Sequence, residues 1–373
     1  MAQNFFSFSL HERTQDAFVA WLCSCYNEPA TSYLHNVAKE FIEKLLGKKV
    51  NFKAVEVETQ MYNIDILLTL KDVDNTGNDY YMVIEDKINS RVHDNQLVKY
   101  IDKLIKAKGV SQDRIFVVYY KSGHVANTPD CIKLVNNNTC QYDFDPNVKS
   151  EYQEVMSVTN PYPNLAGMKI CYFKDIYDFF CNNPLISKCG CFILDDYADY
   201  IDAEYKQYNS GVIDAKGGRT DRQWERIFDE AITRNKSKYP DLTFKLAFTG
   251  SYWEIYVTKK LTGNGVQTCT DPILNVRSSI FEGKFPKIYF MNFRGLKTTP
   301  PLKMNAKTAT YSIPTYNPTF YHGKLISINY QQPMISTKHI DDLLDAICEE
   351  YERVCNNGFK VPFSLLRYDC SVS

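Results

Sequence analysis

Two strand-like segments that end in charged residues do most to restrict what this 373-residue chain folds into. Residues 64–70 are nearly all apolar, as expected of a buried strand, but Asp65 interrupts them. Residues 80–84 form a second apolar run, which three charged residues follow directly. Between the two, residues 72–78 are rich in Asp, Asn and Gly, which favours a turn. The pattern predicts a hairpin that carries charge at one end of a buried sheet.

Helical patterns surround this predicted hairpin. Apolar residues at helical spacing predict helices over 12–25 and 32–46, the latter ended by Gly47, and a third over 94–108. A further buried strand is predicted at 114–120. The order predicts an α/β fold in which helices flank a sheet. Residues 122–168 are predicted to be irregular, and beyond them we expect a strand near 169–173 and helices near 174–181 and 191–206.

The second half of the chain has a different pattern. Gly-containing segments within 209–218 predict a linker, after which we expect a helix at 220–235, β-rich sequence over 244–330 and a final helix at 338–355. We therefore expect two domains, an α/β domain over 1–206 and an α+β domain of unknown role over 207–373. The aromatic residues of the β-rich part either pack a core or stack on bases.

Composition excludes several classes of protein. The net charge of -1 argues against a globally basic polyanion binder, although a local basic groove remains compatible with it. The twelve Cys are too sparse for a disulfide scaffold and lack zinc-finger spacing, which predicts reduced thiols and a cytoplasmic protein. No apolar run approaches the roughly 20 residues that span a bilayer, so no membrane association is expected.

Asp65, Glu85 and Lys87 are the residues that most suggest chemistry. Residues two apart on a strand share a face, so Glu85 and Lys87 are expected on one side, and the hairpin would bring Asp65 to them. Two close carboxylates repel unless a cation lies between them, and Mg²⁺ or Mn²⁺ with an adjacent ammonium meets that demand. Such a set suits phosphodiester hydrolysis. The alternative is a solvated surface ion pair that contributes less than about 1 kcal/mol.

The following helix carries candidate nucleic-acid contacts. Gln96, Lys99, Tyr100 and Lys103 lie within a narrow arc of this helix. Residues 84–124 hold eight Lys or Arg against five Asp or Glu, a modest local excess of positive charge. This face would suit a nucleic-acid backbone, or it is merely solvated.

Three short motifs in this order and spacing resemble those of a known family. They are Asn63-Ile64-Asp65-Ile66-Leu67-Leu68, Ile84-Glu85-Asp86-Lys87-Ile88 and Gln96-Leu97-Val98-Lys99-Tyr100. The set is similar to that of the PD-(D/E)XK nuclease superfamily, and looks most like its uncharacterised prokaryotic branch. The segment from Glu12 to Leu22 also resembles the first helix of that branch. The chain departs from the branch at three points: Gln15-Asp16 stands where the branch has a Ser-containing pair, Asp86 replaces its commoner Asn, and the Asp-Pro that follows the Trp helix is absent.

The resemblance covers residues 10 to 120 and implies a restriction-endonuclease-like mixed sheet. It further implies that Asp65 and Glu85 bind the metal, that Lys87 is the catalytic lysine and that Gln96 orients groups nearby. Many members draw another acidic residue from a helix before the sheet, for which Glu12 is the family-matched candidate. Glu58 matches an acidic residue that precedes the motif Asp, and it ranks with Glu12 as a secondary candidate. Glu40, on the helix immediately before the first strand, is a further candidate by its position, but a surface glutamate is the favoured interpretation. For His35 the favoured interpretation is a hydrogen-bonded structural histidine.

Two functions are therefore open. The first is a Mg²⁺- or Mn²⁺-dependent nuclease, with DNA as the favoured substrate, in prokaryotic defence or repair. The alternative is a catalytically silent module of the same fold that binds nucleic acid or a protein partner. We also leave open a homodimer or a protein partner bound through residues 207–373.

Overall fold

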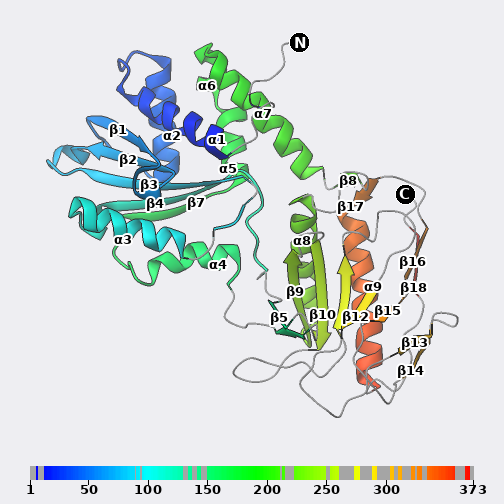
Figure 1. Ribbon diagram of the computed structural model, residues 1–373. Coiled ribbons are helices and arrows are strands. Elements are labelled where there is room, and N and C mark those ends of the chain that lie inside the picture. The colour runs from blue at the N-terminus through cyan, green and yellow to red at the C-terminus, as the bar shows by residue number, and fades with distance from the viewer. Residues whose placement is uncertain are drawn as a thin grey trace. The chain divides into compact units, whose positions relative to one another are not determined.

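The computed structural model shows two compact units (Figure 1). Unit 1 comprises Met1–Val125 and Glu151–Ser210, and unit 2 comprises Ala126–Ser150 and Gly211–Ser373. The sequence places one boundary after residue 206, whereas these units also assign the internal segment 126–150 to unit 2. The described residues are 6, 12–88, 90–92, 95–128, 133–136, 141–143, 149–210, 212–214, 222–248, 253–259, 273–277, 288–291, 303–305, 310–312, 321–323, 326–329, 334–357 and 366–369.

Unit 1 is a mixed five-stranded sheet with helices on both faces. Its strand order is β1-β2-β3-β4-β7, in which β1, β2 and β3 are antiparallel neighbours and β3, β4 and β7 run parallel. The restriction-endonuclease-like mixed sheet expected from the sequence is confirmed. The elements are α1 (Glu12–Ser24), α2 (Tyr33–Leu46), β1 (Ala54–Thr59), β2 (Ile66–Lys71), β3 (Tyr80–Lys87), α3 (Gln96–Lys108), β4 (Ile115–Lys121), α4 (Glu151–Met156), β7 (Gly167–Cys171), α5 (Phe173–Asn182), α6 (Pro184–Cys189) and α7 (Phe192–Asn209).

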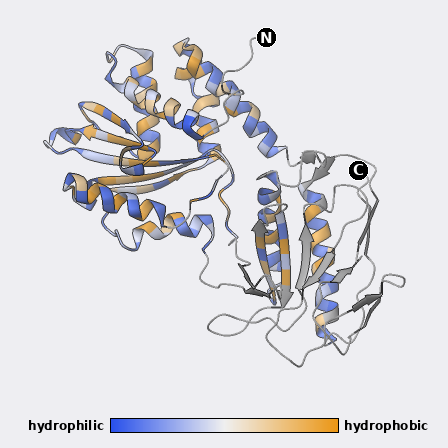
Figure 2. Ribbon diagram, in the orientation of Figure 1, coloured by the Kyte–Doolittle hydropathy of each residue, from blue (hydrophilic) through white to orange (hydrophobic). Residues whose placement is uncertain are grey.

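The larger core lies between the sheet and the helices α1, α2, α5 and α7 (Figure 1). Alternate residues of the strands point to this side, among them Ile84 on β3 and Tyr120 on β4. Phe18 of α1 stacks on Tyr197 of α7 with ring centroids 3.8 Å apart. Figure 2 shows hydrophobic colour along the strands and mixed colour along the covering helices, as expected for amphipathic helices on a buried sheet.

The opposite face of the sheet is covered by α3 and α4 (Figure 1). Val83 and Tyr119, which alternate with the residues of the first face, pack there against Leu97 and Ile101 of α3. Gly109 ends α3 with a φ of 64°, in the left-handed region that glycine adopts readily. Since α4 lies within residues 122–168, that segment is less irregular than the sequence suggests.

Unit 2 contains a five-stranded antiparallel sheet in the order β15-β12-β11-β10-β9. Helices α8 and α9 pack together, and α8 also contacts β9 and β10. Trp253 and Tyr256 are buried, which favours core packing for these two aromatics; Tyr252, Tyr316 and Phe320 lie outside the described residues. The elements of unit 2 are β5 (Lys133–Asn136), β6 (Gln141–Asp143), β8 (Val212–Asp214), α8 (Arg222–Lys238), β9 (Leu242–Phe248), β10 (Trp253–Lys259), β11 (Ile273–Arg277), β12 (Ile288–Met291), β13 (Lys303–Asn305), β14 (Thr310–Ser312), β15 (Tyr321–Gly323), β16 (Ile326–Asn329), β17 (Met334–Ser336), α9 (Thr337–Asn356) and β18 (Leu366–Asp369).

The helices within the described residues do not meet the requirements of a membrane span. None of them is both long enough and apolar enough to cross a bilayer. The Gly-rich part of the expected linker, near residue 217, lies outside the described residues.

Candidate active site

The predicted hairpin forms, and it brings three charged side chains together. β2 and β3 pair with Ile66 opposite Ile84, so Asp65 and Glu85 lie at the same end of the hairpin. Glu85 and Lys87 point to the α3 face of the sheet with Val83, whereas Asp86 points to the α1 face. The pleat of β3 thus places Glu85 and Lys87 on one face of the sheet and Asp86, the residue between them, on the other.

A tight turn before β2 sets the position of Asp65. Gln60, Tyr62 and Asn63 adopt left-handed backbone conformations, with φ of 56°, 57° and 65°. Such conformations cost on the order of 1 kcal/mol or more for a residue other than glycine, so surrounding contacts must hold the turn. The Gln60 amide N–H donates to the Asp65 carbonyl at 3.1 Å, and the Gln60 side chain donates to the Asp65 carboxylate at 3.4 Å.

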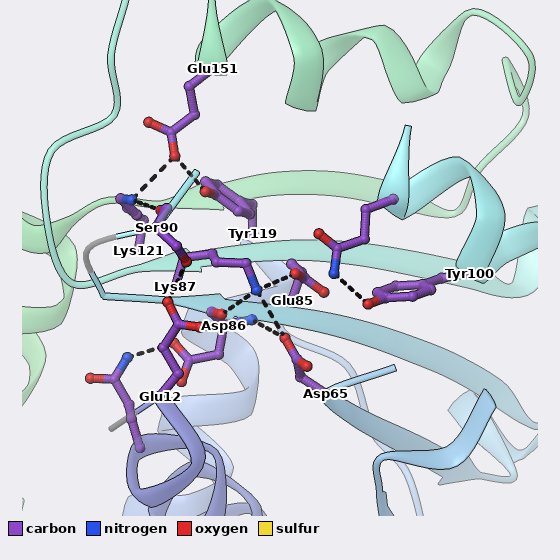
Figure 3. A network of polar contacts seen from close by, with 12 residues as sticks. Glu12, Asp65, Glu85, Asp86, Lys87, Ser90, Tyr100, Tyr119, Lys121 and Glu151 are labelled. Atoms are coloured by element: carbon purple, nitrogen blue, oxygen red, sulfur yellow. Dashed lines mark hydrogen bonds and ion pairs between the residues drawn. The ribbon is translucent and has the colours of Figure 1, made fainter. Parts of the chain in front are cut away.

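The Lys87 ammonium lies between the two carboxylates (Figure 3). Its Nζ is 3.4 Å from Asp65 Oδ2, in direct contact with Glu85 Oε1, and donates to the Asp86 carbonyl at 3.0 Å. Asp65 Oδ2 also accepts a hydrogen bond from the Asp86 backbone N–H at 3.2 Å. Glu85 is fully buried and Lys87 is 6% exposed. The charges therefore interact in a largely desolvated site, where each has a stronger effect than at a surface.

Burial and neighbouring charge shift the titration of this cluster. Burial raises the pKa of Glu85 to about 8, with Asp65 adding to the rise and the Lys87 ammonium opposing it. Burial alone would lower the pKa of Lys87, but the negative charges of Glu85 and Asp65 outweigh it, and the pKa is raised. Lys87 therefore stays protonated at neutral pH, while Glu85 retains a proton across much of the neutral range.

A second pair of carboxyl groups lies on the other face of β3. Asp86 accepts a 2.5 Å hydrogen bond from the Gln15 side chain of α1, and Asp16 lies beside it. Burial raises the pKa of Asp86 well above its ordinary value, and the Asp16 charge adds to this. The pKa of Asp16 is raised to about 6, first by burial and then by Asp65. Gln15 also accepts hydrogen bonds from Ser122, which directly follows β4, and from Tyr197 of α7, so it connects α1 with both.

Of the four residues predicted on helix α3, Gln96 and Tyr100 contact each other, whereas Lys99 and Lys103 are exposed. Gln96 donates a 2.5 Å hydrogen bond to the Tyr100 hydroxyl, and the Tyr100 ring is buried. Burial raises the pKa of Tyr100 to about 12, and the negative charges of Glu85 and Asp65 contribute, so this hydroxyl lies within electrostatic reach of the carboxylates. Lys99 and Lys103 are exposed, and Lys103 donates to the Tyr62 carbonyl in the turn before Asp65.

The secondary acidic candidates lie in different surroundings. Glu12 of α1 accepts a hydrogen bond from the Ser90 hydroxyl and contributes to the raised pKa of Lys87, which places it at the site. Glu58 of β1 pairs with Lys108 at 3.7 Å. Glu40 is exposed on α2 and accepts a hydrogen bond from Asn183. His35 donates to the Tyr26 carbonyl through Nδ1–H and packs on the Tyr26 ring, as a structural histidine does.

The carboxylates fit a hard divalent cation. No hydrogen-bond donor within the described ranges reaches Glu85 Oε2, although this atom is buried. No three His, Cys, Asp or Glu side chains in the described part of the chain gather closely enough to hold a metal alone. Mg²⁺ is commonly bound through one or two carboxylates, with water and substrate phosphate completing its shell. Asp65 and Glu85 therefore suffice as the protein's share of such a site.

Several residues near the site escaped the sequence reasoning. Lys121 lies at the end of β4, directly opposite Lys87 in the parallel register, and it pairs with Glu151 at 3.2 Å. The position of Lys121 at the end of a predicted neighbouring strand is a signal that could have been used. Glu151 offers no such signal, because it begins a helix of only six residues within a polar segment.

A mixed sheet whose central hairpin ends in two carboxylates and a lysine is the arrangement of the restriction-endonuclease-like nucleases. A scan against protein-family models matches residues 3–178 to the PD-(D/E)XK nuclease superfamily. This match supports membership of that superfamily for residues 3–178, and it agrees with the resemblance seen in the motifs. No curated protein matches the chain, and no solved structure does either. The match indicates a nuclease-type function, and nucleases of this superfamily generally use divalent metals.

Proposed function

We propose that the chain is a nuclease that hydrolyses phosphodiester bonds with Mg²⁺ or Mn²⁺, and that DNA is its favoured substrate. The observation that carries this proposal is the convergence of Asp65, Glu85 and Lys87 at one end of the hairpin. The match of residues 3–178 to a nuclease superfamily supports it independently.

Each of the three side chains has a role that its surroundings support. Asp65 and Glu85 would hold the metal, which when bound neutralises phosphate charge and lowers the pKa of a water ligand. Lys87 would orient the attacking water and contact a phosphate oxygen. The negative charges of Asp65 and Glu85 raise the pKa of Lys87, so a bound metal that neutralised them would lower this pKa and increase the fraction of unprotonated amine. Gln96, through Tyr100, would orient groups beside the carboxylates.

The proposed nucleic-acid contacts lie on α3. Lys99 and Lys103 are exposed, and Lys103 reaches the backbone of the turn that precedes Asp65. Cations here would attract the phosphate backbone independently of base sequence. Tyr100 is buried, so we assign it to the site wall beside the carboxylates and not to base stacking. Glu12 is the stronger of the two secondary acidic candidates, because Ser90 and Lys87 connect it with the site.

Cleavage assays with Glu85→Gln test the proposal directly. Purified protein is incubated with plasmid, single-stranded DNA and RNA in Mg²⁺, Mn²⁺ or EDTA. We expect metal-dependent cleavage by the unaltered chain and a loss of at least about 100-fold in the variant, because the variant loses a metal ligand. Glu40→Gln, the same change at an exposed glutamate of α2, is the control and should cleave normally. Cleavage by Glu85→Gln at the normal rate would refute the assigned site.

The alternative is a catalytically silent module that binds nucleic acid or a protein partner. The raised pKa of Glu85 favours it, because a protonated carboxyl group is a poor metal ligand. Calorimetric titration with Mn²⁺ and a gel-shift assay with DNA separate the two. Retarded DNA without metal binding at pH 8 would favour the silent module, whereas metal binding with cleavage would favour the nuclease.

The cellular setting follows from weaker signals. We propose a role in prokaryotic defence or repair, on the resemblance to a prokaryotic branch of the superfamily. All the described cysteines are free thiols, which suits a reducing compartment such as the cytoplasm. A protein partner, or a second copy of the chain, bound through residues 207–373 stays a prediction that pull-down and light scattering would test.

A further inference from the structure

A buried ion pair lies next to the site but outside its motifs (Figure 3). Lys121 and Glu151 are each 2% exposed, and Lys121 Nζ is 3.2 Å from Glu151 Oε1. The Tyr119 hydroxyl donates to the same glutamate oxygen at 2.5 Å. Removing two charges from water costs several kcal/mol each, so the pair is an expensive means of adding stability alone. Its burial also excludes Lys121 from direct contact with a nucleic-acid backbone.

The Lys121 ammonium has another partner, and it leads to the site. Lys121 Nζ donates to the carbonyl of Ser90, three residues beyond Lys87. The Ser90 hydroxyl in turn donates to Glu12. Lys121 of β4 therefore holds the backbone at Ser90, and Ser90 in turn holds Glu12 of α1. Glu12 is close enough to Lys87 to contribute to its raised pKa.

Two backbone features tie the same segments together. The Ser122 N–H donates to the Lys87 carbonyl at 3.1 Å. A Cβ added to Gly123 would lie 2.3 Å from the Ile88 carbonyl oxygen. The two backbone segments therefore approach too closely there for any residue with a side chain. The segment that leaves β3 thus packs against the segment that leaves β4 where Lys87 and Ile88 meet Ser122 and Gly123.

We propose that Lys121 and Glu151 are positioning residues, which fix Ser90 and its described neighbours Ile88, Arg91 and Val92 and thereby hold Lys87 and Glu12 in the geometry needed for hydrolysis. The proposal rests on the proposed nuclease function for the identity of the positioned groups. It adds residues that lie outside the three motifs. Glu151 would act through Lys121, because its ion pair holds the Lys121 ammonium where it donates to the Ser90 carbonyl.

A double variant tests the pair without leaving a lone buried charge. Lys121→Met/Glu151→Gln removes both charges while keeping an acceptor for the Tyr119 hydroxyl. We expect kcat to fall at least tenfold with KM for DNA nearly unchanged, because binding residues on α3 are untouched. Amides of residues 88–92 should exchange hydrogen at least tenfold faster. Lys121→Arg keeps the cation in a different shape, so it should lower kcat less than the double variant does.

The control removes an ion pair of unit 1 away from the site. Lys44→Met/Asp175→Asn breaks a 3.1 Å pair between α2 and α5. It should lower Tm while leaving kcat and the exchange of residues 88–92 unchanged. Glu151→Gln alone is the milder variant if the double variant fails to fold, and it should show the same changes to a smaller degree.

The two proposals fail differently. If no substrate is cleaved by the unaltered chain in either metal, the nuclease function is refuted, and hydrogen exchange still decides whether the pair holds residues 88–92. If the unaltered chain cleaves DNA and the double variant retains normal kcat, or normal exchange at residues 88–92, the positioning role is refuted while the function stands.

Discussion

Glu85 is the residue at which burial and charge compete most strongly. Its side chain is fully buried and its pKa is raised to about 8, yet it contacts an ammonium that opposes that rise. A carboxyl group in this state is stable as a neutral acid and becomes costly once it ionises without a metal. The site therefore stores unfavourable energy in its metal-free, ionised form, and a divalent cation would relieve it.

The stability of the metal-free protein should consequently fall as the pH rises. Folded Glu85 holds its proton up to about pH 8, whereas the unfolded group releases it near 4.5, so the folded state binds more protons between these values. We expect the free energy of unfolding to fall across this window by on the order of 4 kcal/mol from this group at most. Urea unfolding in EDTA at pH 5, 6, 7 and 8 measures it.

The same experiment contains its own control. Glu85→Gln cannot ionise, so its unfolding free energy should depend less on pH than that of the unaltered chain. Asp16 and Asp86 also have raised pKa values and leave a residual slope of the same sign. Equal slopes in the two proteins would show that Glu85 titrates in the folded chain as it does in the unfolded chain.

Lys87→Met should separate catalysis from metal binding. The ammonium contacts both carboxylates and competes with any cation for them, so its removal should leave Mn²⁺ affinity unchanged or tighter. If Lys87 has the proposed role, cleavage should fall by about 100-fold or more, because the attacking water and the phosphate would lose their contact with the lysine. Calorimetry and cleavage assays read the two effects. Lys174→Met, at an exposed lysine of α5, should change neither.

At the scale of elements, the sequence predicts what is encoded locally. The β2–β3 hairpin follows from two apolar runs and a turn of Asp, Asn and Gly, and the pairing of Ile66 with Ile84 brings Asp65 to Glu85 as expected. Contacts between distant segments were not predictable in this way. Gln15 reaches Asp86 across 71 positions, and no local pattern encodes which residues of α1 face the far side of β3.

Length also limits what a pattern reveals. Helix α4 has six residues, too few for an apolar periodicity to emerge from a polar segment. Its first residue, Glu151, is the partner of Lys121, so the sequence pattern could not predict this ion pair. The longer helices α1, α2 and α3 were predicted to within a few residues, because each buries a full apolar stripe.

Gly123→Ala should disturb the packing between the segments that follow β3 and β4. The new methyl group would meet the Ile88 carbonyl oxygen at 2.3 Å, and backbone must move to relieve this. We expect a loss of about 1–3 kcal/mol of stability and a fall in kcat of at least tenfold. Thermal unfolding and cleavage rates measure the two.

Gly167→Ala is the matched comparison, because its methyl group would lie 2.9 Å from the Phe116 ring at the opposite end of the strands. It should lower stability while leaving kcat normal. A normal kcat in Gly123→Ala as well would mean that residues near Ile88 shift without effect on the site.

At the scale of the whole molecule, the two units are interleaved along the chain. Residues 126–150 leave unit 1 after Val125, belong to unit 2, and return at Glu151. Within unit 2, the Asp229 carboxylate of α8 accepts hydrogen bonds from the N–H groups of Asn127 and Thr128 at 3.0 and 2.7 Å. The inserted segment is therefore held by a helix that lies beyond the end of unit 1.

Cutting the chain between the units should leave the fragments associated. A protease site placed after Ser210 separates the backbone, but the N-terminal fragment still carries residues 126–150 of unit 2. We expect both fragments to elute together in size-exclusion chromatography. Asp229→Ala should weaken this association, whereas Asp341→Ala, whose partners Arg234 and Asn235 lie on the same fragment, should not. Separation of the fragments from the unaltered sequence would contradict the assignment of residues 126–150.

The interleaving also sets an order of events during synthesis. A ribosome delivers Asn127 and Thr128 about a hundred residues before Asp229, the group that binds them. At about 5–20 residues per second, that segment waits roughly 5 to 20 seconds for its partner. Meanwhile β7, α5 and α7 emerge and complete the sheet and core of unit 1. The sheet of unit 1 can thus be complete before the residue that binds Asn127 and Thr128 has been synthesised.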